Sequence, residues 1–356
     1  MLEAPRRLVT RSLAKPTIGD DDALLRVEAC GLCGTDHEQY SGMLFGGFAF
    51  VPGHEAVGVV EELGARAAER WQVGVGDRVA VEVFQSCRRC DACRTGDYRR
   101  CARHGLADMY GFVPVDRPPG LWGGYAEVQY LAPDSMLVSV PDTLDPVLAT
   151  LFNPVGAGIR WGVTLPGTRE GDVVAVLGPG IRGLATVAAV RDAGAGFVLV
   201  TGAGARDATR LDAARRFGAD LTVDVEADDP VGALRAATGG LADVVVDVTA
   251  NAPSALTQAV ALARPGGTVV VAGMRGDGPL PGFRADLVVL KELRLLGALG
   301  VDVTAYAAAL DLIASDRYPF RDVARRVVGL DDAGDLLATM AGETDEVAPI
   351  HGVVRP

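Results

Sequence analysis

The chain has 356 residues, of which 49% are apolar and 22% are charged. This length corresponds to about two domains, and the apolar share suffices for a buried core, which excludes a disordered chain. With 34 basic and 46 acidic residues, the net charge is −12. Because an acidic protein is repelled by nucleic-acid backbones and anionic lipid, we expect neither nucleic acid nor membrane as a partner.

The first 150 residues are predicted to be rich in β-strands, and all six cysteines lie there. Short, partly alternating apolar runs separated by Gly and Pro occupy residues 22–30, 56–63, 77–83 and 125–131. No secretory signal follows Met1, and no uncharged apolar run reaches the roughly 18 residues of a membrane span. We therefore expect a cytoplasmic chain, in which clustered cysteines more often bind metal than form disulfides.

A first group of possible metal ligands follows the first predicted strand. Cys30 and Cys33 form a Cys-x-x-Cys motif, and His54 and Glu55 stand further along the chain. A thiolate, an imidazole and a carboxylate are the parts of an open catalytic zinc site. The spacing alone also allows a redox-active cysteine pair with an ordinary core or surface histidine, and these alternatives stay open here.

A second group consists of four cysteines close together, Cys87, Cys90, Cys93 and Cys101. Four thiolates bind zinc tetrahedrally, and Cys-x-x-Cys turns direct two sulfurs at one ion. Because four protein ligands leave no position for water or substrate, such a site is structural. We predict a structural zinc here, and the alternatives are an iron–sulfur cluster and four unrelated small apolar residues.

From residue 171 onward, short apolar strands alternate with helices. This alternation predicts a doubly wound parallel sheet with helices on both faces, in an α/β fold. The predicted strands are residues 172–177, 197–201, 221–225, 244–247 and 268–272, and the predicted helices are residues 181–193, 207–217, 230–238, 254–262 and 304–315.

A glycine-rich turn joins the first of these strands to its helix. Gly178-Pro179-Gly180-Ile181-Arg182-Gly183 fits Gly-x-Gly-x-x-Gly in the strand–turn–helix context of a dinucleotide site. Glycines allow a tight turn, and backbone N–H groups at the helix N-terminus can bind the pyrophosphate. We therefore expect NAD or NADP to contact Gly178, Gly180, Ile181, Arg182 and Gly183.

The second strand carries no carboxylate at its end, where one would take the ribose hydroxyls of NAD. It ends at Thr201 and Gly202, and Arg206 and Arg210 follow, which could face a 2′-phosphate and so favour NADP without excluding NAD. Alternatively, both arginines are solvated residues at a helix start capped by Asp207. By analogy with the fold, later strand ends line the nicotinamide side, namely Thr249, Ala272, Gly273 and Leu299.

In chain order, these motifs resemble those of zinc-containing medium-chain alcohol dehydrogenases. The shared motifs are Gly-x-Cys-Gly-Thr-Asp, Gly-His-Glu-x-x-Gly-x-Val, the four-cysteine segment and the glycine-rich turn. The resemblance implies a GroES-like β domain over residues 1–154 with both zinc sites. It also implies a Rossmann domain over residues 155–300, and a segment, residues 301–356, that returns to the first domain. The dinucleotide is then expected between the two domains.

The resemblance further implies roles for the first group of ligands. Cys33 and His54 match zinc ligands, and Glu55 matches a neighbouring or exchangeable ligand. Thr35 matches the hydroxyl that takes the proton from the alcohol, and Asp36 matches the carboxylate that orients His54.

Two positions depart from the family pattern. Asn153 stands at the third ligand position, and a neutral amide is a poor zinc ligand. Zinc is then held by Cys33, His54, Glu55 and water with Asn153 nearby, or the site is weakly loaded or empty. Glu38 stands where many relatives carry a proton-relay histidine, and His37 is one step earlier.

These roles imply a zinc-dependent alcohol dehydrogenase or ketone reductase that uses NAD or NADP. Aromatic and apolar residues near the zinc motifs favour a secondary, apolar alcohol, unless they are core residues: Tyr40, Leu44, Phe45, Phe48, Phe50, Trp122 and Phe152. The alternatives are a polyol, sugar or threonine dehydrogenase and, from another class, a catalytically silent NADP-binding protein. An apolar strand near residues 293–296 lies where family members pair their sheets, so we expect a homodimer or homotetramer.

Overall fold

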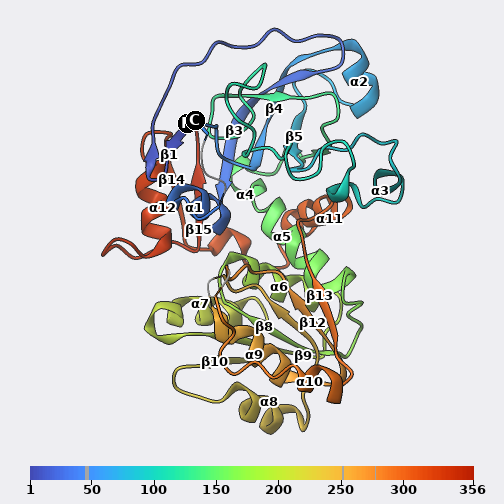
Figure 1. Cartoon of the computed structure of the whole chain (residues 1–356), viewed down its shortest axis with the longest axis vertical. Coiled ribbons are helices and arrows are strands. Elements are labelled where there is room, and N and C mark those ends of the chain that lie inside the picture. The colour runs from blue at the N-terminus through green and yellow to red at the C-terminus, as the bar shows by residue number, and fades with distance from the viewer. Residues whose placement is uncertain (45–47, 251, 277) are drawn as a thin grey trace. The chain divides into compact units, whose positions relative to one another are not determined.

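The structure is a computed structural model that describes residues 1–44, 48–250, 252–276 and 278–356. The chain divides into two compact units (Figure 1). The first unit comprises residues 1–153, 310–315 and 320–356, and the second comprises residues 154–309 and 316–319. The boundary after residue 153 falls inside α5 (Phe152–Ile159), and the boundary after residue 309 falls inside α11 (Val303–Ala314). Among the described residues, no helix combines the length and apolarity needed to cross a bilayer.

The first unit is built on a mainly antiparallel sheet. Its strands follow the order β14-β15-β3-β4-β5-β7, and β6 pairs with β3 beside this path. β3 pairs with β4 along most of its length, and this pairing places Gly31 opposite Glu55. The strands are β3 (Ala23–Leu32), β4 (Glu55–Leu63), β5 (Arg78–Val81), β6 (Val128–Leu131), β7 (Leu137–Ser139), β14 (Arg325–Val328) and β15 (His351–Val354).

The other elements of the first unit are short. They are β1 (Leu2–Ala4), β2 (Arg7–Leu8), α1 (Gly34–Ser41), α2 (Ala65–Trp71), α3 (Asp91–Arg94), the 3-10 turn η1 (Tyr98–Arg100), α4 (Pro146–Ala149), the 3-10 turn η3 (Phe320–Asp322) and α12 (Ala333–Ala341).

Aromatic side chains fill a core beside β3 in the first unit. The ring centroids of Trp122 and Tyr130 are 5.0 Å apart, and those of Tyr110 and Trp122 are 6.1 Å apart. All three side chains belong to one buried cluster with the apolar residues of β3. Trp122 is therefore a core residue, which is the alternative that the sequence left open for it.

The second unit contains a fully parallel sheet of six strands in the order β10-β9-β8-β11-β12-β13. The order reverses between β8 and β11, and ligands bind outside the carboxyl ends of strands at such a point. The strands are β8 (Val173–Leu177), β9 (Phe197–Gly202), β10 (Leu221–Asp224), β11 (Ala242–Asp247), β12 (Ala263–Val271) and β13 (Arg294–Gly297), and the helices between them are α6 (Ile181–Asp192), α7 (Gly204–Arg216), α8 (Pro230–Thr238), α9 (Pro253–Leu262) and α10 (Asp286–Leu290).

The predicted alternation of strands and helices is confirmed for the second unit. α6 and α8 begin where the sequence predicted, and β8, β9 and β10 each agree to within one residue. α7 begins at Gly204 rather than at residue 207, so Asp207 lies inside its first turn and is not its N-cap. In the first unit, α1 was not predicted, because its residues are polar and carry no helical apolar pattern.

His351 lies on β15 and is completely buried, with hydrogen-bond partners at both ring nitrogens. Arg325 Nε donates to His351 Nδ1 at 2.9 Å, and His351 Nε2 lies 3.4 Å from Thr150 Oγ1. The Thr150 hydroxyl itself donates to the carbonyl of Val147 at 2.7 Å. The ring is therefore neutral, with its proton on Nε2, and burial lowers the pKa of His351 to about 3.

This burial predicts a dependence of stability on pH. As pH falls through the ordinary histidine pKa of 6.5, His351 becomes protonated in the unfolded chain. In the folded chain it stays neutral down to about pH 3. Stability is therefore lost on acidification, and we expect wild type to lose about 2 kcal/mol more than His351→Gln between pH 7 and pH 5. Urea unfolding of both proteins at several pH values measures this difference, and parallel curves would contradict it.

Candidate functional site

Cys33 is held at the point where β3 ends and α1 begins. It is the N-cap of α1 and keeps an extended backbone, with φ of −128° and ψ of 176°. Its N–H donates to Asp36 Oδ2 at 2.9 Å, so the Asp36 carboxylate is fixed by the same helix turn that presents the Cys33 sulfur. Both side chains are buried.

His54 and Glu55 reach the same place from the start of β4. Gly53 precedes them with φ of +92°, where a Cβ would lie 2.4 Å from the Tyr125 ring. Gly31 of β3 faces Glu55, and a Cβ there would lie 2.4 Å from Glu55 Oε2. Glycine at position 31 therefore leaves the space that the buried Glu55 carboxylate occupies.

The structure brings Cys33, His54 and Glu55 together, with their ligand atoms within 4.8 Å of one another. Cys33 Sγ lies 3.2 Å from His54 Nε2. This is close to the roughly 3.5 Å expected between a sulfur and a nitrogen bound to one tetrahedral zinc. His54 Nδ1 lies 3.6 Å from Asp36 Oδ1, and both atoms are buried without a hydrogen-bond partner among the described residues.

These residues fit a zinc ion. A ring nitrogen and a carboxylate oxygen that face each other without other partners match a histidine whose Nε2 binds metal and whose Nδ1–H turns to a carboxylate. The separation of 3.6 Å is longer than a hydrogen bond, so the Asp36 carboxylate faces His54 Nδ1 at close range without a hydrogen bond to it. Three close donors leave room for a further ligand, as an open site requires.

The other residues proposed for this site lie on α1 and α5. Asn153 is buried in the first turn of α5, and Thr35 is half-buried in the first turn of α1. Glu38 is half-buried, and burial raises the pKa of its carboxyl group. His37 Nε2 instead lies 3.0 Å from Glu343 Oε1, and Glu343 also forms an ion pair with Arg6.

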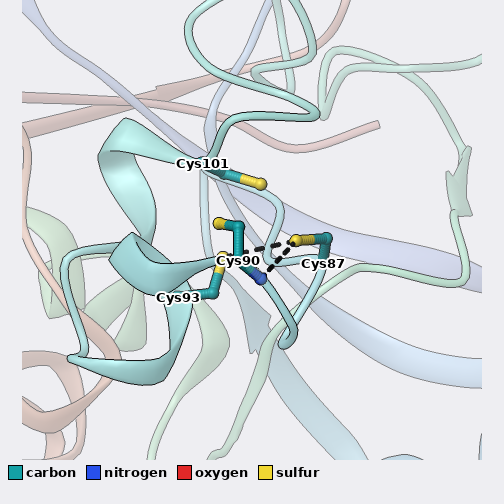
Figure 2. A group of neighbouring side chains, drawn as sticks. All are labelled: Cys87, Cys90, Cys93 and Cys101. Carbon is teal, nitrogen blue, oxygen red and sulfur yellow. Dashed lines mark hydrogen bonds between the residues drawn. The ribbon is translucent and has the colours of Figure 1, made fainter.

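The four predicted structural ligands also come together, with sulfur atoms within 4.8 Å of one another (Figure 2). The Cys87 and Cys93 sulfurs are 3.8 Å apart, and the N–H of Cys90 donates to Cys87 Sγ at 3.4 Å. The N–H groups of Arg89 and Cys90 lower the pKa of Cys87 to about 6. Burial raises the pKa of Cys93 to about 12, so a bound cation is needed to hold all four as thiolates.

The glycine-rich turn after β8 has the shape that a dinucleotide requires. Gly178 has φ of +101°, and a Cβ on Gly183 would lie 1.9 Å from the Gly178 carbonyl oxygen. Gly180 caps α6, and a Cβ there would meet no atom within 4 Å. The first glycine thus forms the turn, the third lets α6 pack against it, and the second leaves open space beside the helix N-terminus.

The carboxylates of Asp207 and Asp224 lie beside the residues that follow β9. Arg210 forms an ion pair with Asp207 at 3.2 Å, and Asp207 also accepts the N–H of Ala203 at 3.0 Å. Asp224, at the end of β10, accepts the N–H of Gly204 at 2.8 Å. Arg206 is exposed, beyond Thr201 and Gly202. Of the two arginines expected to face a 2′-phosphate, Arg210 is therefore already paired with a carboxylate.

Sequence reasoning missed a buried ion pair at the carboxyl end of β11. Asp247 is fully buried, pairs with Arg275 and accepts the N–H and hydroxyl of Thr249. Thr249 packs closely against two glycines. A Cβ on Gly178 would lie 3.0 Å from Thr249 Cγ2, and a Cβ on Gly273 would lie 1.6 Å from the Thr249 carbonyl oxygen. The sequence did offer one signal for this pair, because Asp247 is an acidic residue at the end of an apolar strand.

The remaining strand-end residues follow β12 and β13. Ala272 and Gly273 come directly after β12, and the N–H of Ala272 donates to the Asp247 carbonyl at 2.9 Å. Leu299 follows β13 and is exposed. These positions lie at carboxyl ends of the parallel strands, as expected for residues near a dinucleotide.

Comparison with known proteins now identifies the family. The alcohol dehydrogenase GroES-like domain family matches residues 19–142, and the zinc-binding dehydrogenase family matches residues 183–315. A "Probable alcohol dehydrogenase" of Mycobacterium tuberculosis is 71% identical over 357 residues, covering 100% of this chain and 97% of that protein. The chain belongs to the zinc-containing medium-chain alcohol dehydrogenase family. The predicted GroES-like domain and doubly wound parallel sheet are thereby confirmed.

More distant members of this family resemble the chain over most of its length. Sorbitol dehydrogenase of Bacillus subtilis is 29% identical over 314 residues, covering 87% of this chain and 84% of that protein. A protein from Sinorhizobium meliloti, assigned as a zinc-binding dehydrogenase and solved with NADP bound, superposes with a TM-score of 0.82 at 30% identity. That match covers 100% of this chain and 98% of the other.

The four-cysteine group can be tested through metal content. Cys93→Ala removes one sulfur, and we expect loss of the bound structural zinc and a melting temperature lower by about 5 °C or more, because a structural zinc contributes directly to folding. Elemental analysis and calorimetry measure the two effects. The control is Cys30→Ala, because Cys30 is a buried core residue outside the cluster. Full metal content in Cys93→Ala would contradict the assignment.

The glycine cradle can be tested at its open position. Because a Cβ on Gly180 would meet no atom within 4 Å, Gly180→Ala should fold normally. The added methyl group occupies space that the pyrophosphate needs, and we expect the Kd for NADH or NADPH to rise at least roughly tenfold. Gly240→Ala is the matched control, since its Cβ also meets no atom within 4 Å. Isothermal calorimetry gives both constants, and equal values would refute the cradle.

Proposed function

We propose that the protein is a zinc-dependent alcohol dehydrogenase or ketone reductase that transfers hydride between an alcohol and NAD or NADP. The observation that carries this proposal is the buried group of Cys33, His54 and Glu55. The glycine cradle after β8 and the family membership support it. We assign the zinc sites to the GroES-like domain over residues 1–154, the dinucleotide to residues 155–300, and residues 301–356 to a segment that returns to the first domain. Of that segment, residues 310–315 and 320–356 belong to the first unit and the remainder to the second.

The chain's own residues would act as follows. Cys33 and His54 hold the catalytic zinc, and Glu55 or Asn153 completes the protein ligands. Bound zinc supplies Lewis acidity toward the alcohol oxygen, and the dinucleotide supplies the hydride acceptor. Asp36 orients the His54 ring from its Nδ1 side, and the Thr35 hydroxyl accepts the proton of the alcohol and passes it onward. Ordered side chains on α1 and β4 hold the reacting groups in one geometry.

The aromatic residues that the sequence suggested for the substrate pocket are mostly buried. Phe50, Phe152 and Trp122 are buried, Phe48 is 40% exposed, and Tyr40 packs against a core cluster that contains Cys30. Leu44 is half-buried, and Phe45 lies outside the described residues. We propose a secondary, apolar alcohol, and we keep a polyol as the second candidate because sorbitol dehydrogenase is a relative.

We further propose a homodimer or homotetramer in the cytoplasm. β13 is an edge strand of the parallel sheet, and Leu295 is 40% exposed there. Val289 and Leu290, on the helix before it, are more than 70% exposed. Exposed apolar side chains along a sheet edge support pairing with a second copy, because pairing covers both the apolar surface and the unpaired backbone.

The proposed reaction depends on the zinc ligands. Cys33→Ala and His54→Ala are expected to lower turnover of alcohols and ketones by at least roughly a thousandfold, because each removes a metal ligand. Binding of NADH or NADPH should stay within about twofold of wild type, since the cradle is untouched. Steady-state assays and calorimetry measure these quantities, with Gly240→Ala as the control that keeps activity.

Zinc content and substrate range separate the alternatives. Two zinc ions per chain with activity on apolar alcohols support the proposed enzyme, and activity confined to sorbitol-like substrates supports the polyol candidate. A single zinc per chain, bound dinucleotide and no turnover of any substrate would favour a silent NADP-binding protein. Wild-type turnover in Cys33→Ala would overturn the mechanism.

A further inference from the structure

A π-helical turn in the second unit presents an indole to two of the segments expected to bind the dinucleotide. The turn η2 (Arg160–Thr164) continues α5, and Trp161 is its buried aromatic residue. π-helical turns are rare and occur frequently at functional sites. The contacts of Trp161 show what this turn holds together.

The turn is pressed closely against α6, the helix that begins at the glycine cradle. A Cβ on Gly158 would lie 2.6 Å from the backbone of Ala185, and one on Gly162 would lie 2.9 Å from Thr186 Cγ2. Glycine at both positions therefore permits a backbone approach that no larger residue allows. This close packing fixes the height of the Trp161 ring along α6.

Trp161 contacts the cradle through Arg182. The Arg182 guanidinium carbon lies 5.1 Å from the centroid of the Trp161 ring, within the range of a cation–π interaction. Arg182 belongs to the first turn of α6, at the positive end of the helix, which is expected to bind the pyrophosphate. The buried Trp161 ring therefore holds the charged Arg182 side chain in the turn that is expected to bind the pyrophosphate.

The other edge of the indole contacts the segment after β13. Trp161 Nε1 donates to the carbonyl oxygen of Gly300 at 2.9 Å, and Gly300 has φ of +58°. The neighbouring Arg160 pairs with Asp302 at 3.2 Å. Two consecutive residues of the π-helical turn thus hold residues 300–302, beside the Leu299 expected on the nicotinamide side.

We propose that Trp161 is a positioning residue for the dinucleotide, holding Arg182 and the Gly300 segment in their cofactor-binding arrangement before the cofactor arrives. The inference rests on the proposed function, because it presumes that NAD or NADP binds this unit. Its physical basis is preorganisation: an ordered guanidinium and an ordered loop lose less freedom on binding than mobile ones. Trp161 itself need not touch the cofactor.

The test separates the two contacts by measuring the Kd of the zinc-loaded protein for NADH and NADPH by calorimetry. Trp161→Phe keeps a ring but loses the N–H, and we expect the Kd to rise roughly threefold to tenfold. Trp161→Leu also loses the ring, which should add a further factor of roughly three to five. In an Arg182→Gln background that further factor should vanish, because the ring then has no guanidinium to hold.

Two further measurements distinguish positioning from a general loss of structure. At saturating cofactor, the kcat of both Trp161 variants should stay within about twofold of wild type while KM for the cofactor rises. Trp71→Phe is the matched control: its Nε1 donates to the Ser135 carbonyl at 3.0 Å in the first unit, so its loss should leave cofactor affinity unchanged.

The outcomes distinguish failure of this inference from failure of the proposed function. If wild type binds neither NADH nor NADPH, the proposed function fails. If wild type binds and Trp161→Leu matches Trp71→Phe in Kd, the positioning role is overturned while the function stands. A ring effect that persists unchanged in Arg182→Gln also overturns it. Should Trp161→Leu fail to fold, an unchanged Kd in Trp161→Phe decides against the Gly300 contact.

Discussion

The candidate metal site depends on the antiparallel pairing of β3 with β4. This pairing sets Gly31 opposite Glu55, so that Cys33, just beyond β3, and His54, just before β4, arrive at one end of the sheet. A slip of one residue would turn every side chain of one strand to the other face and separate the donors. The missing side chain at position 31 is what admits a buried carboxylate beside a thiol and an imidazole. Ligand placement is therefore a consequence of strand register.

A different constraint organises the second unit. Parallel strands point their carboxyl ends to one edge, and the reversal of order between β8 and β11 opens that edge to a ligand. Asp247 closes the end of β11, and its pairing with Arg275 joins the segments after β11 and β12. Burial raises the pKa of the Asp247 carboxyl group, which opposes ionisation, while Arg275 and Thr249 stabilise the ionised form. The carboxyl-terminal edge of the sheet is thus stabilised by a buried ion pair as well as by apolar packing.

Sequence patterns predicted the second unit well and the first unit less well, for a physical reason. Buried parallel strands are continuous apolar runs, and such runs stand out in β8, β9, β11 and the second half of β12. α1 is different, because its sequence Gly34–Ser41 serves capping and ligand placement and has no apolar stripe. The ligand motifs could be recognised from sequence because Cys, His and Glu are themselves metal-binding residue types and stand at typical spacings. Contacts between distant residues, such as Trp161 with Gly300, leave no local pattern to read.

The distribution of arginine shows why charge counts predict cofactor preference poorly. The chain carries 34 basic residues against 46 acidic ones, so carboxylates outnumber the cations that they can pair with. Arg210 illustrates this, because Asp207, in the same first turns of α7, takes the guanidinium that could otherwise meet a 2′-phosphate. An anionic phosphate must then compete with a carboxylate already in place, and that competition costs part of the attraction. Arg210 can contribute to a preference for NADP only to the extent that it releases Asp207.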